Sequence, residues 1–385
     1  MTELIKDLWP SILTAFFVSA FVSRLLAYLY VKKGWCAPSR TGGAMPLTGG
    51  IGIVCSLLLM QLLLLISFYW RDLGNRPDAV KFFFRNAFFS KIFPFFIAYL
   101  YFVLGLLDDI YHFRPKPKLL GFAIVLAIYA VFQTIHVNTC STIYTFDYVR
   151  ILIIMAGTFF FANSYNFLDN ANGHCACSLL GLFLALLLLE PEGLRAKDSS
   201  ELVSTIVYFG CSVLSGALIG FLFWNFRKKA KLYLGDAGSL FLGACAFLLA
   251  TRSNYIYKFT NCNFPYQASF QEFLLWANLL LILLAYPIYD TCAVMLLRVL
   301  RGQNPTIGGQ DHYSHRLMRG GFPLWLVNLI AFTAAGILPV VLLTFLKLAH
   351  GAVYFGPFAI WAFLLFLDIL AAVLRKKAAD EPELS

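Results

Sequence analysis

Residues 163–177 read NSYNFLDNANGHCAC and separate two long apolar runs of the chain. Four asparagines, an aspartate and a histidine stand together here, in a chain that is 60% hydrophobic and only 13% charged. Soluble proteins carry about 25% charged residues, so this composition is typical of a polytopic membrane protein. The quoted stretch is therefore interpreted as a polar loop between membrane helices, where concentrated polar groups indicate function.

Apolar runs of about 20 residues predict the membrane helices. The first run contains Arg24 and has no small-residue cleavage site after it, which predicts a retained helix rather than a signal peptide. We expect an all-α, polytopic integral membrane helix bundle of about eleven transmembrane helices in one domain, residues 1–374, followed by a short charged cytoplasmic tail, residues 375–385. The predicted spans cover residues 9–31, 47–70, 92–108, 119–136, 150–167, 174–190, 203–223, 238–251, 273–297, 322–346 and 354–374.

An odd number of spans places the two termini on opposite sides of the membrane. With the C-terminal RKK in the cytoplasm, every loop rich in carboxylate, amide and histidine falls on the cytoplasmic face. The bias of Lys and Arg towards this orientation is weak, because the loop from Arg71 to Lys91 puts five basic residues on the other face. The polar loops share one face in either orientation, which predicts a single catalytic face.

Neither the cysteines nor the positive charge indicates a disulfide framework, a zinc site or a nucleic-acid partner. The nine cysteines are odd in number and show no CxxC spacing, so neither a disulfide framework nor a zinc knuckle is expected. Cys175 and Cys177 begin an apolar run just after His174, and their side chains would point about 200° apart on a helix, so we interpret them as packing residues rather than zinc ligands. The net charge of +10 is assigned to topology and lipid contact, and no nucleic-acid partner is expected.

Acidic, histidine and basic residues at the ends of the apolar runs form the candidate site. Converging carboxylates suit a divalent cation of the Mg²⁺ type, which takes oxygen ligands and binds together with substrate phosphates. Basic residues beside them would neutralise a diphosphate, so the set predicts phosphoryl transfer, which depends mainly on positioning and charge stabilisation. Taken singly, each motif is equally typical of a helix end, a turn or a topology signal. The positions are Asp108, Asp109, Asp169, Asp236, His312 and His315, with the bases Lys116, Lys118, Arg227, Lys228, Lys229, Lys231, Arg301 and Arg316.

Four segments, in this order, resemble the signature loops of the bacterial polyprenyl-phosphate N-acetylhexosamine-1-phosphate transferases. The superfamily of these enzymes includes phospho-N-acetylmuramoyl-pentapeptide transferase. A fifth segment, APSRTGGAMPLTGGIGI at residues 37–53, resembles their early loop, and the resemblance extends from about Gly34 to Gly321. The four segments are GLLDDIYHFRPKPKLLG (105–121), NSYNFLDNANG (163–173), FLFWNFRKKAKLYLGDAGSLFLG (221–243) and GGQDHYSHRL (308–317).

The resemblance implies a reaction. A membrane polyprenyl phosphate, such as undecaprenyl phosphate, attacks the β-phosphate of a UDP-N-acetylhexosamine, such as UDP-GlcNAc, and UMP leaves, with Mg²⁺ or else Mn²⁺ as the cofactor. Residues 1–374 would form a single transmembrane glycosyl-1-phosphate transferase domain in the inner (cytoplasmic) membrane of a bacterium, with its active site on the cytoplasmic side. The product would initiate a cell-envelope polysaccharide, and a homodimer is a further expectation.

The resemblance also assigns roles to individual residues. Asp108, Asp109 and Asp169 become the catalytic residues, and which of them is the base stays open. Asp236 and Asn166 become the metal site. The expected substrate contacts are Lys118, Asn166, Asn172, Asn225, His312, His315 and Arg316.

The chain departs from the family pattern at several positions. Phe122 stands where the family often has glutamine, Asn170 and Asn172 replace the first glycine and the second aspartate of DGxDG, and Ser314 replaces a histidine of HxHH. An amide at position 172 keeps its hydrogen bonds but cannot act as a carboxylate base. The missing histidine favours the transferases of O-antigen, teichoic acid or exopolysaccharide synthesis over the muramoyl-pentapeptide enzymes, which remain the alternative.

Two further alternatives stay open. A transporter also places carboxylates in a helical bundle, but the acids here sit at loop ends on one face, and no inverted repeat is apparent. A catalytically inactive family member with a binding role is the other alternative.

Overall fold

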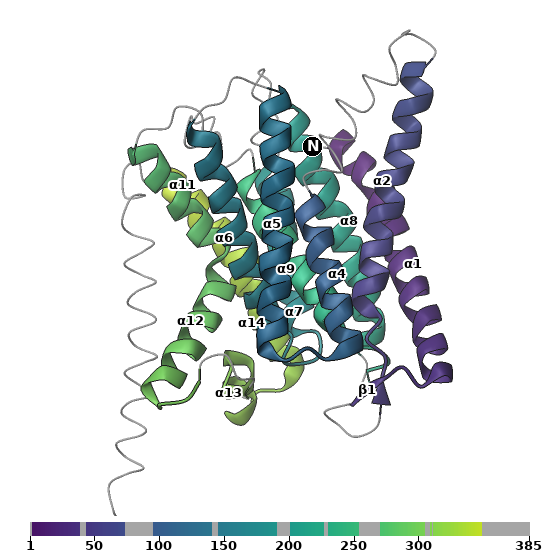
Figure 1. The fold of residues 1–385 in the computed structure, drawn as a ribbon, viewed down its shortest axis with the longest axis vertical. Coiled ribbons are helices and arrows are strands. Elements are labelled where there is room, and N and C mark those ends of the chain that lie inside the picture. Colours follow the sequence, from purple (N-terminus) through teal and green to yellow (C-terminus); the bar gives the residue numbers. More distant parts are fainter. Residues whose placement is uncertain are drawn as a thin grey trace, which may run out of the picture.

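The computed structural model describes residues 2–38, 44–73, 95–140, 145–190, 201–226, 230–253, 270–304, 309 and 311–348. These residues form a helix bundle with one short antiparallel pair of strands at one end, β1 (Ala37–Pro38) and β2 (Ala44–Met45) (Figure 1). The helices are α1 (Thr2–Lys33), α2 (Gly49–Leu73), α4 (Phe96–Tyr111), α5 (Pro115–Cys140), α6 (Thr145–Leu168), α7 (His174–Leu189), α8 (Glu201–Asn225), α9 (Gly235–Thr251), α11 (Phe270–Leu283), α12 (Ala285–Leu300), α13 (Tyr313–Arg319), α14 (Leu324–Phe332), the π-helix η4 (Thr333–Ile337) and α15 (Leu338–Leu348).

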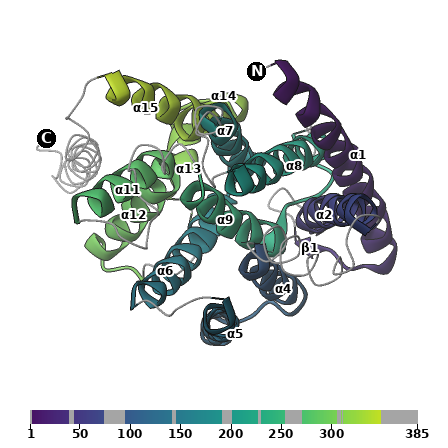
Figure 2. The same cartoon turned by 90° about the horizontal axis from the view of Figure 1, so that it is seen from above.

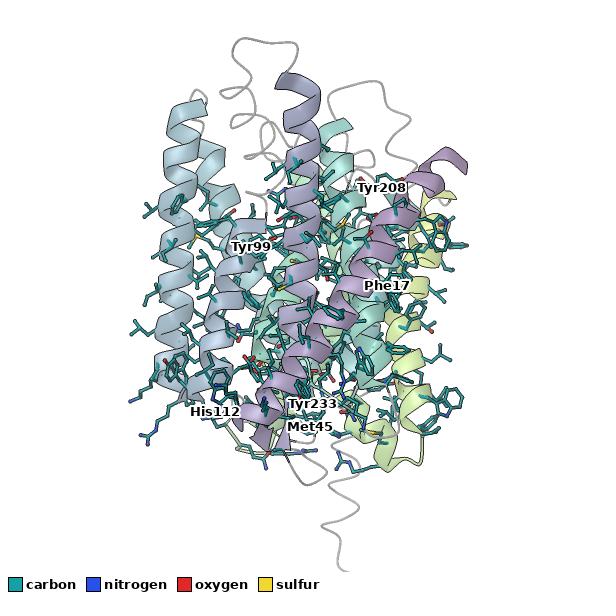
Figure 3. All side chains as sticks on the ribbon, turned by 90° about the vertical axis from the view of Figure 1, so that its right-hand side faces the viewer. Phe17, Met45, Tyr99, His112, Tyr208 and Tyr233 are labelled. Carbon is teal, nitrogen blue, oxygen red and sulfur yellow. The ribbon has the colours of Figure 1, made fainter. Side chains whose placement is uncertain are left out.

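Helices occupy the predicted spans throughout the described residues, whereas the predicted span 354–374 and the tail 375–385 lie outside them. Six helices of the described part are long and apolar enough to cross a membrane, or seven if the bent pair α11 and α12 is one span. Large apolar side chains such as Phe17 and Phe21 stand exposed on the outside of α1, as expected of a surface that faces lipid (Figure 3). The chain is a multi-pass membrane protein, and the number of about eleven spans stays a prediction.

The predicted span 273–297 is not one straight helix. It is broken at Leu284, and the axes of α11 and α12 are bent by 81°. Pro287 stands in the first turn of α12, where its missing N–H is tolerated, but it cannot donate the hydrogen bond that would continue α11. The bend therefore has a local cause in the sequence.

Helix α9 lies at the centre of the bundle, surrounded by α2, α4, α6, α7 and α8 (Figure 2). Its side chains are buried from Ala237 to Ala250, and it is apolar around its whole circumference, which is typical of a helix in a core. Many of its residues are glycine or alanine, which let neighbouring helices approach closely in a membrane. The first residue of α9 lies at the end of the bundle that also carries β1 and α13, so the centre of the fold fixes the position of this end (Figure 1).

Candidate active site

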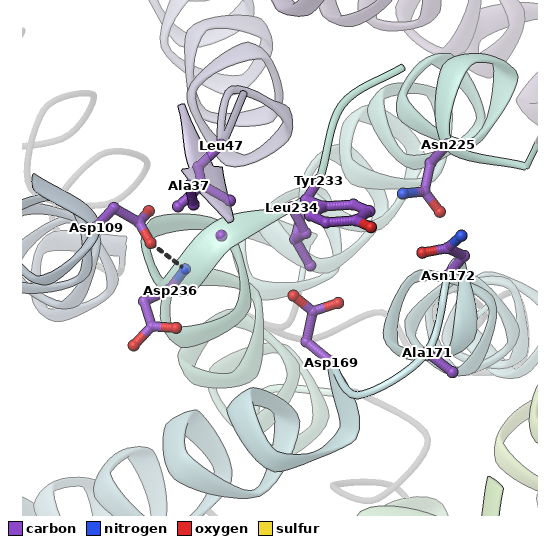
Figure 4. A pocket seen from close by; sticks show the side chains of 11 residues that line it. Ala37, Leu47, Asp109, Asp169, Ala171, Asn172, Asn225, Tyr233, Leu234 and Asp236 are labelled. Atoms are coloured by element: carbon purple, nitrogen blue, oxygen red, sulfur yellow. Dashed lines mark hydrogen bonds between the residues drawn. The ribbon is translucent and has the colours of Figure 1, made fainter. Parts of the chain in front are cut away.

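A pocket of about 190 Å³ lies where α9 begins (Figure 4). Three carboxylates and two amides contribute to its wall. They come from α4, from the loop after α6, from the end of α8 and from the beginning of α9. The lining residues are Ala37, Leu47, Asp109, Asp169, Ala171, Asn172, Asn225, Tyr233, Leu234, Gly235 and Asp236.

Backbone pairing brings the early loop to the start of α9. The Tyr233 N–H donates to the Pro46 carbonyl at 3.0 Å, and the Gly49 N–H donates back to the Tyr233 carbonyl at 3.0 Å. The Gly50 N–H donates to the Leu234 carbonyl at 2.9 Å. Two segments that are nearly 190 residues apart therefore form one wall of the pocket, as a short parallel bridge between Leu47 and Tyr233.

Asp109 of α4 caps the N-terminus of α9. Its Oδ1 accepts the Asp236 N–H at 2.8 Å, and its Oδ2 accepts the Ala237 N–H at 3.0 Å. The N–H groups of a first helical turn have no partner within the helix, and the positive end of the helix dipole favours a carboxylate there. Gly235 has φ of +78°, and a Cβ at this position would lie 2.5 Å from the Asp109 Oδ2, so this close approach requires glycine.

Lys118 of α5 is a shared counter-ion for two of the aspartates. Its Nζ lies 2.6 Å from Asp108 Oδ2 and also forms an ion pair with Asp236 Oδ2. The other oxygen of Asp108 accepts the Phe113 N–H at 2.8 Å, and Asp108 does not line the pocket. An ammonium has three donors, so Lys118 can serve both carboxylates and retain one N–H for a substrate oxygen.

The C-terminal end of α6 supplies the next group. Asn166 donates from Nδ2 to the Ser239 Oγ at 3.0 Å and lies against Asp236. Asp169 follows the last residue of α6, and its carboxylate points into the pocket between Leu234 and Asp236 (Figure 4). The structure thus brings Asn166 and Asp169 together with Asp236.

Asn172 and Asn225 face each other on the far side of the pocket (Figure 4). Asn225 is only 2% exposed, and its Nδ2 donates to the Leu232 carbonyl at 3.0 Å. Its Oδ1 has no hydrogen-bond partner within the described part of the chain. A buried acceptor left in this way costs about 1–3 kcal/mol, so it marks a position that a donor group of a ligand would satisfy.

Of the predicted histidines, His312 directly precedes α13 and His315 lies on it, and neither lines the pocket. His312 Nδ1 lies 2.7 Å from Asp290 Oδ2, and Asp290 Oδ1 accepts the Tyr313 N–H at 2.7 Å. His315 and Arg316 are half-buried on the same helix, and the Arg316 guanidinium lies over the Tyr313 ring at 5.6 Å. Asp290 therefore binds the first turn of α13 to α12.

A second ion pair holds the segment before α13. Arg298 binds Asp311 through two bonds, Nε to Oδ2 at 2.8 Å and Nη2 to Oδ1 at 2.6 Å. Partial burial disfavours the charged form of Asp311, but the bidentate bond from Arg298 outweighs it and holds the pKa of this carboxyl below its usual range. Helix α13, called the histidine helix below, is thus attached to α12 at two points.

Sequence reasoning missed Asp290, Arg298 and Asn328. Each is a single buried polar residue within an apolar run, and each has a partner far away or across a loop. The available signal was the cost of an isolated polar residue inside a membrane span, which by itself indicates a function or a partner. Periodicity and spacing carry no information about such partners.

The other predicted positions are placed as follows. His174, Cys175 and Cys177 lie at the start of α7, where Cys175 Sγ donates to the Tyr165 carbonyl at 3.4 Å and His174 is buried in a polar chain. Phe122 is a core residue, with its ring 5.8 Å from that of Tyr101. Lys116, Lys231 and Arg301 are exposed, and residues 227–229 lie outside the described residues.

The pocket fits a divalent cation that also binds substrate. No group of three His, Cys, Asp or Glu side chains suited to hold a metal by itself occurs among the residues that the structure describes. Asp169 and Asp236 nevertheless offer carboxylate oxygens in one pocket. Mg²⁺ typically takes one or two carboxylates and completes its ligands with water and substrate phosphates, so this donor set is compatible with it.

Comparisons with known proteins agree with the resemblance seen in the sequence. Residues 91–254 match the sequence profile of glycosyl transferase family 4. A Bacillus subtilis protein named "Probable undecaprenyl-phosphate N-acetylglucosaminyl 1-phosphate transferase" is 25% identical over 282 residues, which cover 72% of this chain and 71% of the relative. The decaprenyl-phosphate N-acetylglucosaminephosphotransferase of Mycolicibacterium smegmatis is 29% identical, over 60% of this chain and 59% of the relative.

A relative from the other branch is also similar. The phospho-N-acetylmuramoyl-pentapeptide-transferase of Chlamydia muridarum is 26% identical over 286 residues, covering 62% of this chain and 76% of that protein. The resemblance to both branches of the superfamily is thereby confirmed.

Proposed function

We propose that this chain, whose residues 91–254 match glycosyl transferase family 4, transfers a sugar 1-phosphate from a UDP-sugar to a polyprenyl phosphate and releases UMP. N-acetylglucosamine 1-phosphate is the transferred group in the names of the first two relatives described above. The acceptor is a lipid, which agrees with a pocket at one end of a membrane bundle.

The observation that carries the proposal is the convergence of charge around this pocket. Asp109, Asp169 and Asp236 come from three separate segments and line one pocket, and Lys118 pairs with Asp236 at its edge. Catalysis of phosphoryl transfer consists largely of positioning and of stabilising spread negative charge. A transporter offers no comparable reason to place this set at one end of the bundle.

The acceptor phosphate needs orientation more than deprotonation. A phosphate monoester has a second pKa of about 6, so most of it is already a dianion at neutral pH. An oxygen of this phosphate attacks the β-phosphorus of the UDP-sugar, the bond from the β-phosphorus to the bridging oxygen breaks, and UMP leaves with that oxygen. We assign Asp169 to orienting the reacting groups, because its carboxylate points into the pocket.

The remaining aspartates have supporting roles in this proposal. Asp109 positions the start of α9, and with it Asp236, through its two bonds to the backbone. Asp108 holds Lys118 in place beside Asp236. The third N–H of Lys118 and the Asn225 oxygen are left for oxygens and donor groups of the nucleotide sugar.

Asp169 and Asp236 would hold Mg²⁺, with Asn166 supporting Asp236 from α6. When bound, Mg²⁺ would neutralise charge on the diphosphate and favour the departure of UMP. The histidine helix beside the pocket, with His312, His315 and Arg316, would contact the sugar or its diphosphate. A cytoplasmic pocket and a homodimer complete the proposal.

An assay with purified protein tests the reaction. Labelled UDP-GlcNAc, undecaprenyl phosphate and Mg²⁺ should give a lipid-linked sugar and one equivalent of UMP, and chelation by EDTA should stop both until Mg²⁺ is restored. A panel that includes UDP-MurNAc-pentapeptide separates the two branches of the superfamily. If no UDP-sugar of the panel yields UMP or lipid product, the protein does not have the proposed activity.

A further inference from the structure

We propose that a single buried hydrogen bond, from Ser314 to Asn170, positions the histidine helix α13 against the pocket. The Ser314 Oγ donates to the Asn170 Oδ1 at 2.6 Å, and the two residues are 144 positions apart in the chain. Ser314 is 0% and Asn170 6% exposed, so water does not compete for the bond. The inference rests on the proposed function and deepens it, because it names what aligns the two sides of that site.

The direction of this hydrogen bond follows from a second one. The Nδ2 of Asn170 donates to the Phe167 carbonyl at 2.9 Å, which turns the amide oxygen towards Ser314. The hydroxyl of Ser314 must then be the donor. Both side chains are therefore held in one orientation, as a positioning contact requires.

Asn170 and Ser314 each lie between two residues of the proposed site. Asn170 follows Asp169 and precedes Asn172, both of which line the pocket. Ser314 lies on α13 between His312 and His315. The bond thus joins the loop after α6, which carries Asp169, to helix α13, which carries His315.

Helix α13 depends on such contacts for its place. It has only seven residues, and helices this short are not stable alone. Asp290 and Arg298 attach its beginning to α12. On its other side, Ser314 contacts the loop after α6, and the ring of His312 lies 6.2 Å from that of Phe167 at the end of α6. Without the Ser314 bond, α13 would remain attached to α12 but lose its fixed distance from Asp169.

The expected effect is on turnover rather than on donor binding. Ser314→Ala should lower kcat about tenfold and change KM for the UDP-sugar less than about twofold, because the pocket itself stays intact and only the alignment in the transition state is lost. Asn170→Ala should do the same. In a double-mutant cycle, Ser314→Ala with Asn170→Ala should lower kcat about tenfold and not about a hundredfold, since the second change removes a bond already lost.

Ser56→Ala is the matched control. Ser56 is also fully buried, but within the described ranges of the chain its hydroxyl bonds only the backbone carbonyls of Gly52 and Ala15, which do not line the pocket. Its kcat should equal that of the unchanged protein. If Ser314→Ala does not fold, Ser314→Cys, which is nearly the same size and a weak donor, takes its place and should lower kcat by a smaller factor.

A second measurement does not depend on activity. Tryptic cleavage after Arg319, at the end of α13, should become several-fold faster in Ser314→Ala than in Ser56→Ala, because an undocked short helix opens more often. Absence of product from the unchanged protein would count against the proposed function, while faster cleavage would still support the docking contact. An active enzyme whose kcat and cleavage rate are unaffected by Ser314→Ala, or whose single losses multiply in the double variant, would overturn the inference.

Discussion

Asp109 and Asp236 both belong to the pocket wall, yet their carboxylates have different partners. Both carboxylate oxygens of Asp109 accept backbone N–H groups of α9, whereas Asp236 faces Lys118 and Asn166. An acid with two backbone partners is held as a structural cap, and an acid with a lysine and an amide partner can exchange one of them for a ligand. The same residue type thus has two roles within one pocket.

This difference predicts unequal effects on stability for two substitutions that both lower turnover. Asp109→Asn turns an NH₂ group towards a backbone N–H, so we expect a loss of about 1–3 kcal/mol in the free energy of unfolding as well as a loss of turnover. Asp236→Asn still accepts a bond from Lys118, so turnover should fall at least about a hundredfold while stability changes by less than about 1 kcal/mol. Thermal unfolding in detergent and UMP release measure the two effects.

Ser67→Ala provides the control for this pair. Ser67 is exposed on α2, eighteen residues after Gly49, whose N–H bonds the Tyr233 carbonyl at the pocket. It should leave both measurements unchanged. Normal stability of Asp109→Asn would contradict its capping role, and near-normal turnover of either Asp109→Asn or Asp236→Asn would remove that residue from the proposed site.

Two departures from the family pattern prove to be in contact. Asn170 and Ser314 are separate oddities in the sequence, where one replaces a glycine and the other a histidine. In the structure they are hydrogen-bonded to each other. A single sequence does not reveal such a pair, because its two members are 144 residues apart.

At the scale of elements, a buried polar chain connects the pocket loop with three helices. The Asn328 Nδ2 of α14 donates to the Asn172 carbonyl at 2.8 Å, so its Oδ1 is an acceptor for His174 Nδ1, 3.2 Å away. His174 Nε2 lies 2.8 Å from the Tyr286 hydroxyl, which donates to it when the ring is neutral. The Nδ1 of His174 thus carries a proton, and the chain runs from the loop through α14 and α7 to α12.

His174→Phe should break this chain at its centre. It leaves the Asn328 oxygen and the Tyr286 hydroxyl without their partner in a fully buried place, so we expect a loss of about 2–4 kcal/mol in the free energy of unfolding. The melting temperature in detergent measures the loss, and Tyr111→Phe, which removes an exposed hydroxyl, is the control. A melting temperature of His174→Phe equal to that of Tyr111→Phe would show that the chain does not stabilise the fold.

Elements were more predictable than their partners. Apolar runs gave the helices, because helix length in a membrane follows from bilayer thickness and leaves a continuous apolar signal. The bend at Leu284 was not predicted, although Pro287 signals it, because an apolar run reads as one helix. The pocket carboxylates were found because polar residues stand out at helix ends, while Asp290 and Asn328 were not, because the partner that explains each of them is set by helix packing.

At the scale of the whole molecule, the polar and charged residues of the proposed site are concentrated at one end of the bundle. The pocket, the strands and α13 lie at this end (Figure 1). Three exposed bases stand near these elements in the chain: Lys116 is two residues from Lys118, Lys231 is two residues from Tyr233, and Arg301 directly follows α12. Figure 3 places Met45, His112 and Tyr233 there and Tyr208 towards the other end. The proposed donor, a UDP-sugar, is a charged solute that does not cross a bilayer, so the proposed reaction requires this end to face the compartment that contains it.

The basic residues predict that this compartment is the cytoplasm, since loops rich in Lys and Arg remain on that side. A cysteine introduced by Lys116→Cys should react with a membrane-impermeant maleimide in sealed inside-out vesicles and be protected in right-side-out vesicles. Thr2→Cys, at the first residue of α1 and ahead of its membrane-spanning part Trp9–Lys33, should show the reverse pattern. Peptide mass spectrometry assigns the label to each position and separates it from native Cys36. Labelling of Lys116→Cys from the outside would invert the orientation, and the pocket would then have to take its nucleotide donor from the external face.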